Sequence, residues 1–331
     1  MERKKVLAPA LVQVARAEQP DVDVLKKLLN ELKKVAEVEA YRPSNLQAWV
    51  EAVKGVNAIL GHGRINENLL RHADKLEMVQ NTGIGYDNID VSACTKRGVI
   101  ACNVAEIYSG PVAQHAWALI LDLSKNLSKA DRSMRAGKYR PEAYFGVQLW
   151  GKTLGIIGLG ANGSRIAMKG RLAFGMKVLA NDPYILPARA QRYGAELVSL
   201  ERLLMESDVV SLSPMLTAET RHMIGEKELS LMKKSAILVN TSRGPIIDQD
   251  ALIKCLQRGD IRGAGLDVFE QEPLSPDSSL LNMENVVLTP HIASTTTEAV
   301  EKTYEGAVAN VVRYMKEEKP YWIINPEAYK R

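Results

Sequence analysis

Residues 153–163 read Thr-Leu-Gly-Ile-Ile-Gly-Leu-Gly-Ala-Asn-Gly, a short apolar run that leads directly into a glycine-rich turn. The apolar run predicts a buried strand, and the residues after the turn predict the start of an amphipathic helix. In this context Gly158 allows a tight turn, Gly160 lets a pyrophosphate approach the backbone, and Gly163 lets the helix lie close to the strand. The N–H groups of the helix N-terminus would bind the phosphates. The stretch therefore predicts a dinucleotide-binding βαβ unit.

A second strand is expected at residues 176–180, and it ends at Asn181-Asp182-Pro183. Asp182 follows Gly163 by 19 residues, close to the separation of about 20 at which this fold places the acid that binds the adenosine ribose. A carboxylate there accepts hydrogen bonds from the ribose hydroxyls and repels a 2′-phosphate. Because no Arg or Lys directly follows Asp182, the pattern favours NAD over NADP. An ordinary βαβ unit that ends in an Asx-Pro turn would show the same residues.

Composition and charge narrow the classes of function. The chain has 331 residues, which is enough for two domains, and its net charge of +4 is mild. No basic block supports nucleic-acid binding, so the charge is better explained by a locally basic site for a small anionic substrate. No stretch approaches the length of a membrane span. The cysteines are odd in number and widely spaced, so we expect no metal site, no disulfide framework and a cytoplasmic location. They are Cys94, Cys102 and Cys255.

Strand and helix signals alternate along both halves of the chain, which predicts the α/β class with parallel sheets. Residues 1–104 form one such unit, which lacks the glycine fingerprint. One long helix is expected from Pro111 to about Arg135, and the alternation resumes at Lys152. A last helix from about residue 297 could return to pack on the first unit, which would make that domain discontinuous.

Three loops at expected strand ends carry polar side chains that could take part in catalysis. They contain Arg243, Glu272 and His291. A histidine titrates near neutral pH and can exchange a proton, and a neighbouring carboxylate would favour its charged form and fix its tautomer. The planar guanidinium of an arginine suits a carboxylate. Taken singly, each could be an idle loop residue, but ligands of parallel α/β sheets bind at the carboxyl ends of strands.

The chain resembles the D-isomer-specific 2-hydroxyacid dehydrogenases, which include phosphoglycerate dehydrogenase, glycerate dehydrogenase/hydroxypyruvate reductase and D-lactate dehydrogenase. The resemblance covers nearly the whole chain. It is carried by TGIGYDNID at 82–90, GLGANG at 158–163, NDP at 181–183, NTSRG at 240–244, GLDVFEQEPL at 265–274 and LTPHIAS at 288–294.

This resemblance implies two Rossmann-like domains with an interdomain active-site cleft, and usually a homodimer. The substrate-binding domain would comprise residues 1–104 plus 297–331, and the NAD-binding domain residues 105–296. Arg243, Glu272 and His291 would be the catalytic residues. The backbone at Ile84 and Gly85 would bind the substrate carboxylate, Asp182 the adenosine ribose and Asp267 the nicotinamide carboxamide. The full set expected to bind the cofactor is Gly158, Gly160, Asn162, Gly163, Asp182, Thr241 and Asp267.

The chain departs from the family pattern at a few positions. Ser213 stands where the family often has histidine, in a loop near the cofactor, and Gln114 replaces a helix glutamate. We expect His62, in a Gly-His-Gly loop, to border the substrate. The remaining histidines are interpreted as surface or helix-packing residues; they are His72, His115 and His222.

Other functions share these motifs. An NAD(H)-sensing binding protein, as in the related C-terminal-binding corepressors, can retain the same three residues, but the chain carries no appended tails of that kind. Formate dehydrogenases have Gln where this chain has Glu272. Hydroxypyruvate, glyoxylate and 3-phosphoglycerate are the expected substrates, and for the last only the short form without a regulatory domain fits. The sequence alone decides neither the acid nor the direction of the reaction.

Overall fold

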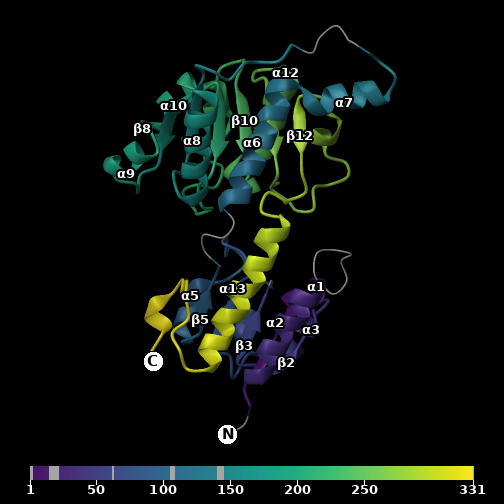
Figure 1. The fold of residues 1–331 in the computed structure, drawn as a ribbon, viewed down its shortest axis with the longest axis vertical. Coiled ribbons are helices and arrows are strands. Elements are labelled where there is room, and N and C mark those ends of the chain that lie inside the picture. The colour runs from purple at the N-terminus through teal and green to yellow at the C-terminus, as the bar shows by residue number, and fades with distance from the viewer. Residues whose placement is uncertain (1–2, 15–21, 62, 105–108, 140–144, 331) are drawn as a thin grey trace. The chain divides into compact units, whose positions relative to one another are not determined.

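The computed structural model describes residues 3–14, 22–61, 63–104, 109–139 and 145–330. The chain divides into two compact units, which are described separately (Figure 1). The first unit is Met1–Ile107 with Thr296–Arg331, and the second is Tyr108–Thr295. Among the described residues, no helix combines the length and the hydropathy that crossing a membrane requires. His62 lies outside the described residues, so its expected place beside the substrate remains a prediction.

The first unit contains a parallel sheet with the strand order β2–β1–β3–β4–β5. The strands are Lys5–Leu7 (β1), Glu37–Glu39 (β2), Ala58–Leu60 (β3), Met78–Gln80 (β4) and Ile100–Cys102 (β5). The central strands are buried apolar segments because helices cover both faces. In the register of β4 and β5, Gln80 pairs with Cys102. The residues that follow these two strands, Asn81 and Asn103, therefore leave the sheet side by side.

Two groups of helices cover this sheet. One face carries Pro9–Val14 (α1), Val22–Val35 (α2) and Thr297–Met315 (α13), and the other carries Leu46–Ala52 (α3), Glu67–Leu70 (α4) and Val91–Lys96 (α5). In Figure 1, α13 lies alongside α2 although the two are far apart in sequence. The C-terminal helix thus belongs to the first unit, packed through Ala307, Val308 and Val311. A short 3-10 helix at Pro326–Ala328 follows it.

The second unit contains a parallel sheet with the strand order β12–β11–β10–β9–β6–β7–β8. The strands are Thr153–Ile157 (β6), Lys177–Asn181 (β7), Ala195–Leu197 (β8), Val209–Leu212 (β9), Ile237–Asn240 (β10), Gly263–Leu266 (β11) and Val286–Leu288 (β12). The strand order reverses between β6 and β9, where Ile157 pairs with Leu212. Ligands of such sheets bind outside the carboxyl ends of strands at this switch point.

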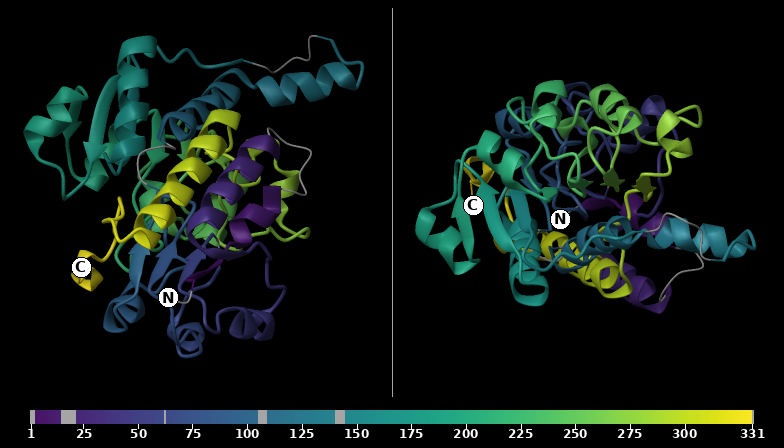
Figure 2. Two further views of the ribbon diagram at one scale, coloured as in Figure 1. Left: turned by 60° about the horizontal axis from the view of Figure 1, so that its bottom comes forward. Right: turned by 90° about the horizontal axis from the view of Figure 1, so that it is seen from above.

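Helices also cover both faces of the second sheet. One face carries Ser109–Lys125 (α6) and Ala161–Phe174 (α8), and the other carries Leu200–Glu206 (α10), Glu226–Ser230 (α11) and Gln249–Arg258 (α12). Pro187–Arg192 (α9) packs beside β8. Two 3-10 turns, at Gly244–Ile246 and Ser279–Asn282, complete the unit. In both further views, the helix Leu127–Arg135 (α7) extends beyond the sheet of its own unit (Figure 2).

The single long helix expected from Pro111 to about Arg135 is wrong in one respect. It is interrupted at Asn126, which adopts a left-handed conformation with φ of 56°. Asparagine tolerates this conformation better than most residues. The side chain of Asp122 accepts the N–H of Ser128 at 2.8 Å, and so caps the start of α7 from the end of α6. Hydrophobic periodicity continues across the break, which is why the pattern alone did not show it.

Candidate active site

The glycine-rich loop between β6 and α8 is shaped by close backbone contacts. A Cβ on Gly158 would lie 2.7 Å from the nitrogen of Pro214 in the loop after β9, and φ of Gly158 is +83°. A Cβ on Gly163 would lie 2.0 Å from the carbonyl oxygen of Gly158. A Cβ on Gly160, in contrast, would meet nothing within 4 Å. The first and third glycines are thus required by packing, while the second leaves open space over the helix N-terminus.

Asp182, at the end of β7, is directed back toward this loop. Its Oδ2 accepts the N–H of Leu159 at 2.8 Å, and its Oδ1 accepts the N–H of Tyr184 at 2.9 Å. Each carboxylate oxygen has more than one lone pair, so both can accept a further hydrogen bond. Asp182 therefore fixes the glycine loop, and its two oxygens can still accept hydrogen bonds from a pair of hydroxyl groups.

Several buried polar atoms around the switch point have no partner within the described part of the chain. They are Asn162 Oδ1 in the first turn of α8, Ser213 Oγ after β9 and Thr241 Oγ1 after β10. Buried polar groups almost always find a partner, so unpartnered atoms at this place suit a polar ligand there. Gly160, the N-cap of α8, also leaves the first N–H groups of that helix without a side-chain cap. The residues present therefore fit a dinucleotide.

His291 and Glu272 form a hydrogen-bonded pair, with 2.7 Å between His291 Nδ1 and Glu272 Oε2. The other oxygen of Glu272 accepts the N–H of Phe269 at 3.1 Å, which fixes the carboxylate. His291 has a φ of 54°, a left-handed conformation, and its N–H donates to the carbonyl of Asp267 at 2.8 Å. The structure thus brings together the two residues that the sequence placed on separate loops.

The pKa values of this pair move in opposite directions. The hydrogen bond with Glu272 raises the pKa of His291 above its ordinary value, against the opposing effects of burial and of the nearby Arg243 charge. Burial pushes the pKa of Glu272 upward. The hydrogen bonds from His291 and Phe269 and the charges of His291 and Arg243 outweigh it, so the pKa of Glu272 is lowered. The pair therefore favours imidazolium beside carboxylate, with Nδ1 of His291 occupied by Glu272.

Arg243 lies in the loop after β10, and a buried asparagine shapes this loop. Asn240 Nδ2 donates to the carbonyl of Arg243 at 2.8 Å, and Asn240 Oδ1 accepts the N–H of Ser242 at 3.0 Å. The hydroxyl of Ser242 donates to the carbonyl of Pro214, which links the loop to the one after β9. The charge of Arg243 acts on both His291 and Glu272. The three expected catalytic residues are thus close enough to share one electrostatic environment.

Asp267 is fully buried and organises the loop that carries His291. Its carboxylate accepts the hydroxyl of Thr289 at 2.6 Å and the N–H groups of Ile292 and Ala293 at 2.9 and 2.8 Å. Burial alone would raise the pKa of Asp267. The hydrogen bonds from His115, Thr289 and the two N–H groups outweigh this effect, so the pKa of Asp267 lies below its ordinary value. The carboxylate is thus fully engaged inside the protein, and a contact to the cofactor would share these bonds.

Of the two interpretations of His115, surface or helix-packing residue, the second holds, and the packing is against the loop that carries His291. His115 Nε2 lies 2.9 Å from Thr289 Oγ1 and 3.4 Å from Asp267 Oδ1. His115 therefore supports the loop of His291 from α6. His222 is indeed exposed, and its ring bonds to Glu270. The contact of His115 joins residues 174 positions apart, and no local pattern could have shown it.

Ile84 and Gly85 lie in the first unit, on the loop after β4, and both are half-buried. The carbonyl oxygens of this loop accept hydrogen bonds from the side-chain amides of Asn81 and Asn103. Neither asparagine was singled out from the sequence.

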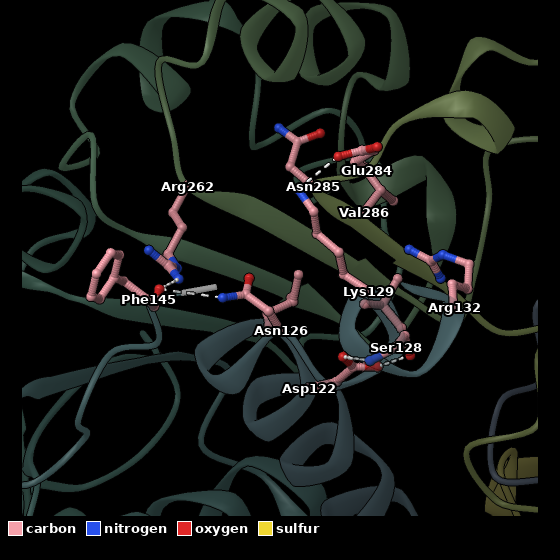
Figure 3. A pocket seen from close by; sticks show the side chains of 12 residues that line it. Asp122, Asn126, Ser128, Lys129, Arg132, Phe145, Arg262, Glu284, Asn285 and Val286 are labelled. Carbon is pink, nitrogen blue, oxygen red and sulfur yellow. Dashed lines mark hydrogen bonds and ion pairs between the residues drawn. The ribbon is translucent and has the colours of Figure 1, made fainter. Parts of the chain in front are cut away.

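A cavity of about 420 Å³ lies away from these loops (Figure 3). It is lined by residues at the amino ends of β11 and β12 and by the end of α6 and start of α7, among them Asp122, Lys129, Arg132 and Arg262. Lys129 pairs with Glu284 at 2.7 Å across its mouth. Because it lies at the opposite end of the strands from His291, it takes no part in the candidate site.

Comparison with known proteins decides the family. Residues 117–293 match the family model described as D-isomer specific 2-hydroxyacid dehydrogenase, NAD binding domain. The chain belongs to this family. It is 42% identical to the glyoxylate reductase of Korarchaeum cryptofilum over 87% of this chain and 88% of that protein. Among solved structures, it resembles a glyoxylate reductase from Paecilomyes thermophila, with a TM-score of 0.88 and 29% identity over 98% of this chain and 99% of that one.

A D-lactate dehydrogenase from Aquifex aeolicus, solved with NAD and lactic acid, is also similar. The TM-score is 0.83 and the identity 32%, over 95% of this chain and 96% of that one. Family membership confirms the α/β fold and identifies the protein as an NAD-dependent oxidoreductase that acts on 2-hydroxy acids. The glycine loop at 158–163 lies inside the matched NAD-binding domain.

Proposed function

We propose that this 2-hydroxyacid dehydrogenase reduces small 2-keto acids to D-2-hydroxy acids, with His291 as the acid/base, Glu272 assisting it and Arg243 binding the carboxylate and carbonyl. The observation that carries the proposal is the His291–Glu272 pair, 2.7 Å apart, within reach of the Arg243 charge. Residues 1–104 plus 297–331 would form the substrate-binding domain and residues 105–296 the NAD-binding domain.

Each catalytic residue has a role that follows from its surroundings. Bound NADH supplies the hydride, and the protein supplies orientation and charge. In reduction, protonated His291 gives its Nε2 proton to the carbonyl oxygen, and in oxidation neutral His291 takes the proton back. Glu272 holds the ring through Nδ1 and stabilises its charge. The guanidinium of Arg243 aligns the carboxylate and attracts electron density toward the carbonyl oxygen.

Replacing Glu272 by glutamine should change the pH dependence of keto-acid reduction. Reduction needs charged His291, so the rate falls as pH rises through the pKa of that residue. Because Glu272 raises this pKa, Glu272→Gln should lower it and move the alkaline limb to lower pH. Oxidation needs neutral His291, so its acidic limb should move the same way. Profiles of kcat/KM in both directions test this, and limbs that stay in place would remove Glu272 from the mechanism.

Asp182 should determine the choice of cofactor. Its oxygens retain acceptor capacity, and their charge would repel a 2′-phosphate. Asp182→Ala should raise the Kd for NADH about tenfold, as expected for losing hydrogen bonds to a charged acceptor, and should raise that for NADPH much less. Binding is followed by nucleotide fluorescence. Equal weakening toward both nucleotides would mean that the substitution only disturbs the glycine loop through Leu159.

Glyoxylate and hydroxypyruvate are the substrates we propose, with 3-phosphoglycerate as the alternative. The support is that similar proteins are named glyoxylate reductases. NADH oxidation should be measured with glyoxylate, hydroxypyruvate, pyruvate, phosphohydroxypyruvate and bulkier 2-keto acids. Turnover strongest with glyoxylate or hydroxypyruvate would support the proposal. Tight NADH binding without turnover of any acid would instead favour a sensor of the nucleotide.

We further propose a cytoplasmic homodimer. Its support is the apolar surface on and after α7, where Leu127, Met134, Phe145 and Trp150 are exposed. Large apolar side chains that are exposed in one subunit become buried where a partner subunit covers them. All three cysteines are free and buried, which suits a reducing compartment. Light scattering should give twice the mass of the chain, and cell fractionation should recover the enzyme with cytoplasmic markers; a monomer mass or a different fraction would contradict these assignments.

A further inference from the structure

The loop after β4 has its carbonyl groups held by two buried asparagines. Asn81 Nδ2 donates to the carbonyl oxygen of Gly85 at 2.6 Å and lies 3.4 Å from that of Gly83. Asn103 Nδ2 donates to the carbonyl oxygen of Ile84 at 2.9 Å. Because these neighbours are carbonyl oxygens, which only accept, each asparagine must face them with its NH₂ group. Three consecutive peptide carbonyls are thus held by side-chain donors.

The orientation of these peptides fixes the orientation of their N–H groups. A trans peptide directs its C=O and its N–H to opposite sides. With the carbonyls of Gly83 and Ile84 held toward the asparagines, the N–H groups of Ile84 and Gly85 point away from them. Within the described part of the chain, these two N–H groups donate to no protein acceptor. They are therefore available to an anion, as in other backbone nests.

A second layer of amide groups holds the asparagines in place. Gln80 Nε2 donates to the carbonyls of Asn81 and Asn103 at 2.8 and 2.9 Å, and Gln80 Oε1 accepts from Asn310 Nδ2 at 2.8 Å. Asn310, on α13, also bonds the backbone of Tyr321 in both directions. The four amide side chains of this network are all buried. Asn81 Oδ1 is buried without a partner in the described part of the chain, but the remaining hydrogen bonds of this buried network oppose its rearrangement.

We infer that Asn81 and Asn103 are positioning residues for substrate binding. They turn the peptide units of the loop so that the N–H groups of Ile84 and Gly85 present themselves to the carboxylate of the 2-keto acid. This inference rests on the proposed function, since it assumes that the loop receives that carboxylate. The network contains no titratable group, so its donors persist at every working pH. We therefore expect the pH dependence of the enzyme to come from His291 and its neighbours.

Loss of the positioning asparagines should weaken substrate binding without slowing hydride transfer. N–H donors hold the carboxylate equally in the bound substrate and in the transition state, so their loss should raise KM and spare kcat. Asn81 and Asn103 should each be replaced by leucine, which has similar size and no donor, and by aspartate, which has the same shape and only acceptors. We expect KM for the best 2-keto acid to rise about tenfold or more, with kcat within about threefold and KM for NADH unchanged.

Asn325 provides a matched control in the same unit. It is also buried, and its side chain bonds the backbone at Ala101 and Val99, away from the loop. Asn325→Leu and Asn325→Asp should lower the melting temperature as the test variants do, because buried backbone groups lose their partners. They should leave KM for the acid unchanged. A rise in KM that simply follows the loss of stability, Asn325 variants included, would overturn the positioning role.

A binding measurement distinguishes this inference from the proposed function. Calorimetric titration of the NAD complex with oxalate, a dicarboxylate probe, needs no turnover. If the wild-type enzyme reduced no 2-keto acid, yet Asn81 and Asn103 variants weakened oxalate binding about tenfold, the proposed function would fail and the positioning role would stand. If the enzyme reduced 2-keto acids, yet the Asn81 and Asn103 variants kept wild-type KM and oxalate affinity, the positioning role would fail alone.

Discussion

His291→Ala should lower kcat for keto-acid reduction by about 10²–10⁴-fold, the usual contribution of a positioned general acid. The hydride donor, the arginine and the substrate loop would all remain, so the lost rate reflects proton transfer alone. NADH affinity should stay within about twofold of wild type, because the direct contacts of His291 are to Glu272, Asp267 and Thr289. Stopped-flow measurement of hydride transfer, in addition to steady-state rates, shows whether the chemical step itself has slowed.

Two further variants make this prediction specific. His291→Asn suits the left-handed φ of 54°, because asparagine adopts that conformation readily, so an equal loss of rate would exclude backbone rearrangement as the cause. His222→Ala is the matched control, since His222 is another loop histidine with φ of 52° and a glutamate partner, Glu270. It should leave kcat unchanged. If His222→Ala and His291→Ala slowed the enzyme equally, His291 would have no special role.

The features that sequence reasoning could predict are those with a local physical cause. The glycines at 158 and 163 are required because a Cβ would collide with backbone atoms, so their spacing between an apolar strand and a helix start predicts the βαβ unit. The catalytic side chains follow apolar strand segments, and parallel strands bring their carboxyl ends to one edge. This rule selected the three loops, and the resemblance to the family then singled out Arg243, Glu272 and His291 within them.

The features that it missed depend on contacts between distant parts of the chain. His115 reaches Thr289 across 174 positions, and Asn310 reaches Gln80 across 230. A buried amide is not distinguishable in sequence from a surface one, because its partners are set by tertiary packing. The break at Asn126 was missed for a related reason: the left-handed residue interrupts the backbone without interrupting the hydrophobic pattern.

Arg243→Gln should lower kcat/KM for the keto acid by about 10²–10³-fold, comparable to the loss of one charged donor that stabilises a developing oxyanion. KM should rise and kcat should fall together, because the guanidinium is proposed to bind both the carboxylate and the carbonyl oxygen. Arg243→Lys should recover only part of the loss, since an ammonium retains the charge but lacks the planar pair of donors. NADH binding should remain close to wild type in both variants.

The pH profile gives Arg243 a signature that a merely structural role would not produce. The positive charge of Arg243 lowers the pKa of His291, whereas Glu272 raises it. Arg243→Gln should therefore raise that pKa and move the alkaline limb of reduction to higher pH, opposite to the shift expected for Glu272→Gln. In the Arg243→Lys variant the limb should stay near its wild-type position, because the charge is kept. Shifts of the same sign in the two glutamine variants would show that Arg243 does not act on His291 by its charge, and the shared electrostatic environment of the three residues would have to be abandoned.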